Sequence, residues 1–156
     1  MLAPTLIAAM KQIRRYFGFL YQRGFRVAST TTTSWLFGSW WVMLESELCK
    51  VQIRSHRDEI NVALHPAVSD EAKGIALESM IYYLSHGEMF IGYFLEKGKL
   101  VSVKRQFKEL AGLLNAYLDE AIPYFGPEYP KYRDALISAQ NEHNDRLLRE
   151  YLGVLR

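Results

Sequence analysis

The chain has a single cysteine, Cys49, so it cannot form an intramolecular disulfide, and this composition is typical of a reducing compartment. It has no apolar run near the roughly 18 residues that a membrane-spanning helix requires. The mildly apolar segment 1–10 is followed, not preceded, by basic residues, which is the wrong order for a secretory signal. We therefore expect a cytoplasmic protein without a membrane span.

Motifs of metal binding and catalysis are also absent. The four histidines never lie three or four positions apart, and there is no calcium-loop pattern, glycine-rich phosphate loop or Gly-x-Ser-x-Gly elbow. Glu142 and His143 are adjacent, but helix neighbours point about 100° apart. Cys49 alternates with apolar residues, as a buried structural thiol does. We expect a non-enzymatic protein without a cofactor. The alternative is an enzyme assembled from residues distant in sequence, which requires a deep pocket with converging polar groups.

Acidic residues are missing from positions 1–44, which carry five basic residues and a charge of +5. The rest of the chain holds 14 basic and 17 acidic residues, so the net charge is only +2. Such an asymmetry can attract an acidic partner. A binder of nucleic acid or of an anionic surface is therefore one hypothesis, and it would use Arg14, Arg15, Arg23 and Arg26.

Residues 40–64, WWVMLESELCKVQIRSHRDEINVAL, contain three short runs with the period of two that is typical of half-buried strands. One side of each run is apolar, and the last two runs have a clean polar side, as expected of an antiparallel sheet with one face in water. The connections at 46–47 and 55–58 are short, so the pattern predicts a β-meander. Neither contains an Asn-Gly or Asp-Gly pair, and the exact register therefore stays open.

Residues 2–23 are predicted to form an amphipathic helix, because apolar residues recur every three or four positions and Gly24 can end it. We expect this helix to cover the apolar face of the sheet. Residues 25–33 have the β propensity of an edge strand. The Ser/Thr run 29–34 is favoured as a polar edge strand or a mobile loop over a phosphorylation or phosphate-contact loop, since no glycine frame surrounds it. The apolar segment 35–38 is expected to tuck its rings against the end of the sheet.

After the sheet, three helices are expected. The first covers residues 72–85, with Ser69 as its N-cap. Residues 88–99 are apolar without a decisive period, which leaves a short helix or an apolar loop beside the sheet as alternatives. The second helix covers residues 101–122, with Ser102 as its cap, and is broken by the prolines and glycine that follow.

The last predicted helix covers residues 130–152, with ion pairs Glu142/Arg146 and Asp145/Arg149 at i,i+4 spacing. A short turn joins it to the preceding helix, so the two are expected to form an antiparallel hairpin. The fold class is therefore α+β in a single domain over residues 1–156. It comprises an N-terminal amphipathic helix, an antiparallel β-meander of three to four strands and three C-terminal helices.

The outer sheet face is the candidate binding surface, because large apolar side chains beside arginine on a polar face are typical of binding patches. Its predicted residues are Trp41, Met43, Gln52, Arg54, His56 and Arg57. The alternative is that residues 88–100 cover Trp41 and Met43. Single-stranded nucleic acid would stack on such rings, but Glu45 and Glu59 among the outer positions argue against it.

The order of motifs along the chain resembles that of a group of small uncharacterised bacterial proteins. The motifs are Phe17-Gly18-Phe19-Leu20, Gly24-Phe25-Arg26-Val27, the run 40–46, Val51-Gln52-Ile53 and the turn with Arg57, followed by a helical C-terminal half. Some of these look like immunity proteins of toxin–antitoxin or polymorphic-toxin systems. The resemblance covers about residues 1–65 and carries over no catalytic residue. It implies a cytoplasmic protein that binds another protein. We expect a non-enzymatic interaction module, in its sharpest form an immunity-type neutraliser of a toxin, with the basic N-terminal binder as the alternative.

Overall fold

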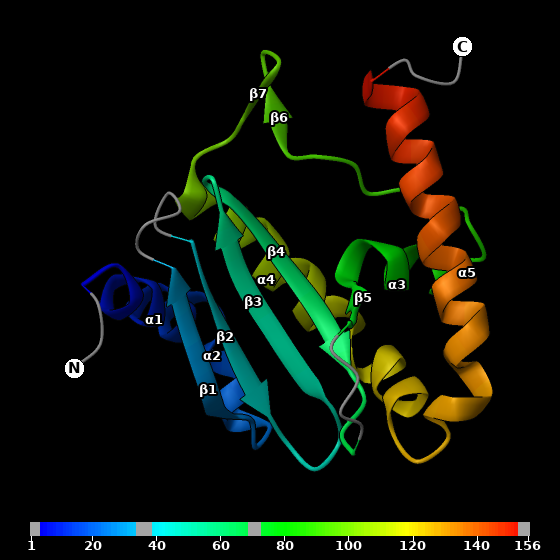
Figure 1. Ribbon diagram of the computed structural model, residues 1–156, viewed down its shortest axis with the longest axis horizontal. Coiled ribbons are helices and arrows are strands. Elements are labelled where there is room, and N and C mark those ends of the chain that lie inside the picture. Colours follow the sequence, from blue (N-terminus) through cyan, green and yellow to red (C-terminus); the bar gives the residue numbers. More distant parts are fainter. Residues whose placement is uncertain (1–3, 34–38, 69–72, 153–156) are drawn as a thin grey trace.

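The computed structural model describes residues 4–33, 39–68 and 73–152, and it shows the expected α+β fold (Figure 1). The first half of the chain holds the N-terminal helices and four strands, and the second half is mainly helical. In chain order the elements are α1 (Pro4–Tyr16), α2 (Gly18–Gln22), β1 (Arg26–Thr33), β2 (Ser39–Glu45), β3 (Lys50–His56), β4 (Glu59–His65), β5 (Ile75–Ala76), α3 (Leu77–Leu84), β6 (Leu95–Glu96), β7 (Lys99–Leu100), α4 (Val103–Ala121), the 3-10 turn η1 (Ile122–Phe125), α5 (Tyr129–Leu147) and the π-helical turn η2 (Leu148–Leu152). Among the described residues, no helix is long and apolar enough to cross a membrane.

The sheet has the strand order β1-β2-β3-β4-β5, and each neighbouring pair is antiparallel. The predicted meander and the edge strand before it are therefore confirmed, and the Ser/Thr run belongs to β1 as far as Thr33. The predicted alternation is confirmed too: apolar positions of β2, β3 and β4 are buried, whereas Trp41, Met43 and Gln52 between them are half-buried. The predicted packing of segment 35–38 lies outside the described residues.

The β3–β4 turn fixes the register that the sequence left open. Arg57 and Asp58 have φ values of 51° and 64°, and a type I′ turn requires positive φ at both central residues. The turn therefore has two residues, shorter than the predicted four, and β3 continues to His56, which pairs with Glu59.

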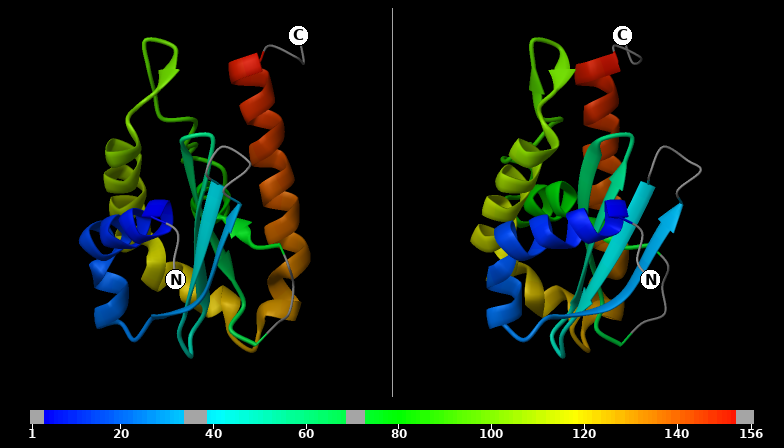
Figure 2. Two further views of the ribbon diagram at one scale, coloured as in Figure 1. Left: turned by 60° about the vertical axis from the view of Figure 1, so that its left-hand side comes forward. Right: turned by 90° about the vertical axis from the view of Figure 1, so that its left-hand side faces the viewer.

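The inner face of the sheet is covered by α1, α2 and α4, which lie together on one side of it (Figure 2). Phe107 of α4 stacks on Trp40 with ring centroids 6.2 Å apart and meets the ring of Phe17 edge-on at 6.1 Å. Burying each ring contributes about 1.5–3 kcal/mol. Cys49 is fully buried in the same core, and its desolvation raises the pKa of the thiol to about 12.

The sequence predicted one continuous N-terminal helix. The structure instead has two helices there, α1 and α2. Phe17 lies between them with φ −106° and ψ 21°, outside helical geometry. The break lets Ile13, Phe17 and Leu20 all enter the core, where each is at most 1% exposed, and Gly18 after it imposes no side chain on the turn.

The predicted helix over residues 72–85 begins later than expected. Ile75 and Ala76 instead form β5 on the end of β4, and α3 starts at Leu77. Strand pairing overrides helix propensity here because it buries the side chain of Ile75 to 2% exposure. The predicted cap Ser69 lies outside the described residues. By contrast, Ser102 caps α4 as expected, with its hydroxyl accepting from the N–H of Arg105 at 3.2 Å.

The predicted antiparallel hairpin of the last two helices is wrong. Helix α5 packs mainly against α3, because η1 and the turn after it redirect the chain around the lower end of the sheet. As a result α5 rises on the side of the sheet opposite to α4 (Figure 2).

The predicted ion pairs of α5 are also replaced. Arg146 bonds Glu150 at 3.1 Å, and neither Glu142/Arg146 nor Asp145/Arg149 occurs among the ion pairs of the described residues. The reason for the second loss is that η2 changes the helical spacing just where Arg149 lies.

One buried amide holds the open side of the sheet. Gln106 of α4 is 1% exposed, and its Oε1 accepts from the N–H of Ile60 at 2.8 Å. Its Nε2 donates to the carbonyls of Asp58 and Val101 at 2.8 and 2.9 Å. Because the N–H of Ile60 points away from β3, this bond closes the edge of β4 against another strand. Gln140 of α5 does the same for β5, since its Oε1 accepts from the N–H of Ala76 at 2.7 Å.

We expect Gln106→Ala to lower the free energy of unfolding by about 2–4 kcal/mol, because it leaves three backbone groups without their partner. Gln106→Glu keeps an acceptor for Ile60 but turns a carboxylate oxygen toward two carbonyls. The decrease in the free energy of unfolding should therefore grow as pH rises and the carboxyl ionises. Urea unfolding measures both. The control is Gln22→Ala at an exposed site on α2, which should stay within about 0.5 kcal/mol of wild type. A Gln106→Ala loss no larger than that of the control would contradict this role.

Candidate binding face and groove

Five of the six predicted binding residues lie on the outer face of β2 and β3, and the sixth, Arg57, lies in the turn after β3. The hollow described below brings together three of them, Trp41, Arg54 and His56. Trp41 pairs directly with Arg54, and Met43 pairs with Gln52. At the end of β3, His56 Nδ1 lies 3.1 Å from the hydroxyl of Ser39. Arg57 follows in the turn. A hollow of about 480 Å³ lies beside Trp41, and its described lining residues all belong to β1, β2, β3 and β4.

Residues 88–100 do not lie over this hollow, contrary to the alternative that they cover Trp41 and Met43. They run as an extended segment and the β6–β7 hairpin across the upper end of the molecule, between α3 and α4 (Figure 1). None of these residues is among the described lining of the hollow. The outer face at Trp41 therefore has strand residues around it and no described helix in front.

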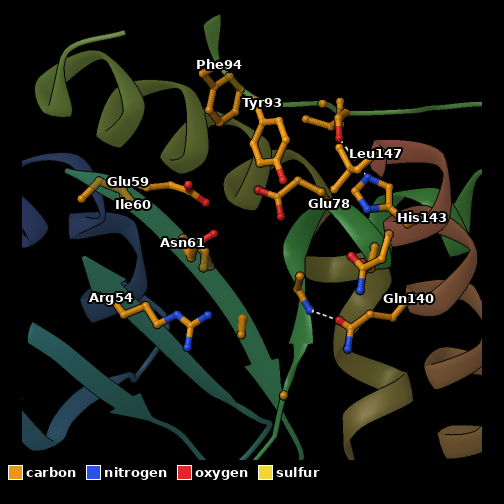
Figure 3. Close-up of a pocket in the computed structure, with 18 of the residues that line it drawn as sticks. Arg54, Glu59, Ile60, Asn61, Glu78, Tyr93, Phe94, Gln140, His143 and Leu147 are labelled. Carbon is orange, nitrogen blue, oxygen red and sulfur yellow. Dashed lines mark hydrogen bonds between the residues drawn. The ribbon is translucent and has the colours of Figure 1, made fainter. Parts of the chain in front are cut away.

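A second feature, which we call the groove, lies between β4 and α5 and has a volume of about 440 Å³. One wall is the outer face of β3 and β4, the other is α5, α3 forms the floor, and the segment 91–94 is the roof (Figure 3). Arg54, Glu59 and Asn61 line both the groove and the hollow beside Trp41. The two concavities are therefore parts of one continuous surface.

Three contacts hold the roof and the adjoining Phe90 to α5 and η2. His143 Nε2 donates to the carbonyl of Ile91 at 2.9 Å, and the guanidinium of Arg146 lies 4.3 Å from the ring centroid of Phe90. The rings of Tyr93 and Tyr151 meet edge-on at 5.2 Å. Gly92 sits so close to Tyr151 that a Cβ would meet the tyrosine hydroxyl, and a larger residue there would displace this ring.

Glu78 is the titratable group at the centre of the groove, in the first turn of α3. The residue as a whole is half-buried, but protein atoms enclose its carboxyl group, and this desolvation raises its pKa from 4.5 to about 7. The charge of Glu59 raises it further, while a backbone hydrogen bond opposes the rise. Among the described residues neither Glu59 nor Glu78 forms an ion pair.

Two buried polar groups beside Glu78 lack partners. Because Nε2 of His143 donates to a carbonyl, Nδ1 of the neutral ring is an acceptor, and it has no hydrogen-bond partner among the described residues. Burial lowers the pKa of this imidazole, a bond to Ile91 raises it, and Arg146 lowers it. The hydroxyl of Ser79 is fully buried and likewise without a partner in the described part of the chain. Both residues line the groove.

Exposed apolar side chains concentrate on the segment that roofs the groove and on η2, and two of them, Tyr93 and Leu100, line the groove itself. Of the nine large apolar residues that are exposed in the described ranges, six come from residues 89–100 or from the end of α5. Tyr93 contacts Tyr151, and Leu95 pairs with Leu100 across the β6–β7 hairpin. We call this set the apolar rim: Met89, Tyr93, Leu95, Leu100, Leu148 and Tyr151.

Sequence reasoning missed the groove because its parts come from four separate elements. In the sequence, Ser79 and His143 fall on the apolar stripes of their helices, and Glu78 belongs to no motif. The one available signal was a polar residue on each apolar stripe. Within the described ranges, no group of three or more His, Cys, Asp or Glu residues is arranged to hold a metal ion. No protein-family model, curated protein or solved structure matches the chain.

Glu78 makes stability depend on pH. Its folded-state pKa of about 7 lies above its ordinary 4.5, so its stabilising effect is complete below about pH 4.5 and is lost as pH rises through 7. In the wild-type protein, ionisation of Glu78 should lower the free energy of unfolding by up to about 3 kcal/mol between pH 5 and 8. Glu78→Gln should abolish this decrease. Urea unfolding across this range measures the effect. Glu120→Gln, at an exposed site on α4, should leave the pH profile unchanged, and an identical profile for Glu78→Gln would refute the assignment.

His143→Ala should loosen the roof, because it removes the bond to the carbonyl of Ile91 and one wall of the packing around Phe90. Amide hydrogen exchange over residues 88–94 should become about five- to thirtyfold faster, which corresponds to about 1–2 kcal/mol of local opening. His86→Asn is the control, since His86 is exposed and its φ of 55° suits asparagine. Unchanged exchange in His143→Ala would show that the roof is held by other contacts.

Proposed function

We propose that this protein is a non-enzymatic interaction module that binds another protein through the outer sheet face and the groove. The observation that carries the proposal is the apolar rim, of which Tyr93 and Leu100 line the groove, because exposed apolar side chains concentrated near a concave surface are typical of protein-binding sites. Trp41 beside Arg54 adds the two residue types that most often dominate binding energy.

The sharpest form of the proposal is an immunity-type neutraliser that binds a toxin and blocks it. Its support is the resemblance of residues 1–65, together with a surface that needs no catalytic group to act. A protein of this kind works by covering the partner's active surface, so affinity and shape decide its function.

The alternative of a basic N-terminal binder has less support from the side-chain contacts. Each of its four arginines is engaged within the protein. Arg14 lies over the ring of Tyr21, Arg15 over Tyr16, Arg23 pairs with Asp119, and Arg26 donates to the carbonyls of Tyr21 and Phe25. Binding to a phosphate backbone would have to compete with these contacts.

An enzyme in the groove is the other alternative, and Glu78 is the observation that favours it, because a carboxyl that titrates near pH 7 suits acid–base chemistry. Nucleophilic catalysis further needs a nucleophile bonded to its base. The hydroxyl of Ser79 and Nδ1 of His143 make no such bond in the described structure. We therefore favour binding over catalysis.

Trp41→Ala should weaken partner binding by about 2 kcal/mol or more, which is the cost of truncating a central aromatic anchor. The measurement is affinity capture from a native lysate with tagged wild-type and variant protein, followed by titration of the recovered partner. Lys108→Ala is the matched control, because Lys108 is exposed on α4, behind the sheet. The proposal fails if wild type recovers no stoichiometric partner, or if Trp41→Ala changes stability alone.

A further inference from the structure

We propose that the groove binds a guanidinium group, presented by an arginine side chain of the partner protein. The inference deepens the proposed function by naming the chemistry that the partner brings to this site. It depends on three independent features of the groove. These are its hydrogen-bond acceptors, its aromatic roof, and the fact that no lysine or arginine of the described residues forms an ion pair with Glu59 or Glu78.

Four groups that line the groove can accept hydrogen bonds. Glu59 and Glu78 present carboxylate oxygens that extend toward the same space from β4 and α3 (Figure 3). Nδ1 of His143 and the hydroxyl of Ser79 are buried acceptors without a partner among the described residues, and a ligand reaches them once the side chains that cover them shift. A ligand that satisfies this set must be rich in N–H donors, and guanidinium carries five in a fixed plane.

The roof suits a flat cation. Tyr93 and Phe94 hang from the segment above the two carboxylates (Figure 3), and guanidinium stacks on aromatic faces more readily than a compact ammonium does. Its planar fork can contact a ring and a carboxylate at the same time. An ammonium would satisfy the charge but not the spread of acceptors over α3, α5 and β4.

The charges around Glu78 explain why the cation has to come from outside. Glu59 faces it from β4, Arg54 from β3, Lys73 from the segment before β5, and His143 from α5. Arg54 and Lys73 are exposed and pair with neither carboxylate. Burial and the charge of Glu59 raise the pKa of Glu78 to about 7, and no cation is among the groups that shift it.

The test uses N-acetyl-arginine-methylamide as the probe, followed by amide NMR shifts at low salt and pH 8.5. The lysine and citrulline counterparts are the comparison probes, since the first keeps the charge and the second keeps the shape without it. Saturable shifts at residues 78, 93 and 143 with the arginine probe, and at least about tenfold weaker binding of both counterparts, are expected. Equal binding of the lysine or the citrulline probe would overturn the proposal, as would no saturable shift with arginine.

Protonation and substitution give the second readout. Arginine binding should weaken at least about tenfold at pH 5.5, where only about 3% of a carboxyl with pKa about 7 is ionised. Glu78→Gln should bind the arginine probe about tenfold more weakly than wild type, and its affinity should depend little on pH. Glu120→Gln should bind the probe like wild type. The pKa of Glu78 itself should fall when the probe is bound. Unchanged affinity in Glu78→Gln overturns the site.

The two proposals fail separately. If the arginine probe does not bind while wild type still captures a partner that Trp41→Ala loses, the guanidinium site is wrong and the interaction module stands. If the probe binds as expected but no partner is captured, the site stands as a guanidinium receptor and the assignment of an arginine on a partner protein is overturned.

Discussion

The amide of Gln106 is the interaction on which the shape of the molecule depends. A four-stranded meander with a short fifth strand has an open edge, and open edges recruit further strands. Gln106 closes that edge at Ile60, and the same amide holds the β3–β4 turn and the segment leading into α4. With Gln140 closing β5, the space beside β4 is lined by side chains and becomes a groove.

That closed edge decides where the remaining helices go. The inner face of the sheet is already occupied by α1, α2 and α4, so α5 stands on the other side and packs on α3. The contacts of His143, Arg146 and Tyr151 then tie the roof to α5. Two layers form the core, and a third, incomplete layer leaves the outer face at Trp41 accessible beside a polar groove.

The sequence predicted the parts that depend on local periodicity. Strand alternation placed Trp41 and Met43 opposite the core, and Ser102 was recognisable as a cap, because both follow from the residue and its immediate neighbours. The type I′ turn at Arg57 and Asp58 escaped prediction, since these residues rarely adopt positive φ without a glycine. Strand β5, the position of α5 and the groove escaped for another reason: they depend on contacts between residues far apart in the chain, such as Gln140 with Ala76, that no pattern in one sequence encodes.

The buried thiol of Cys49 gives the protein a built-in reporter. It is the chain's one sulfhydryl, it is fully enclosed at the start of β3, and its pKa of about 12 keeps it in the unreactive protonated form. An alkylating reagent can therefore modify the native chain only through excursions that open the structure around the end of the β2–β3 connection. The rate of labelling counts those excursions directly, and a partner clamped across β2 and β3 would slow it without touching the sulfur.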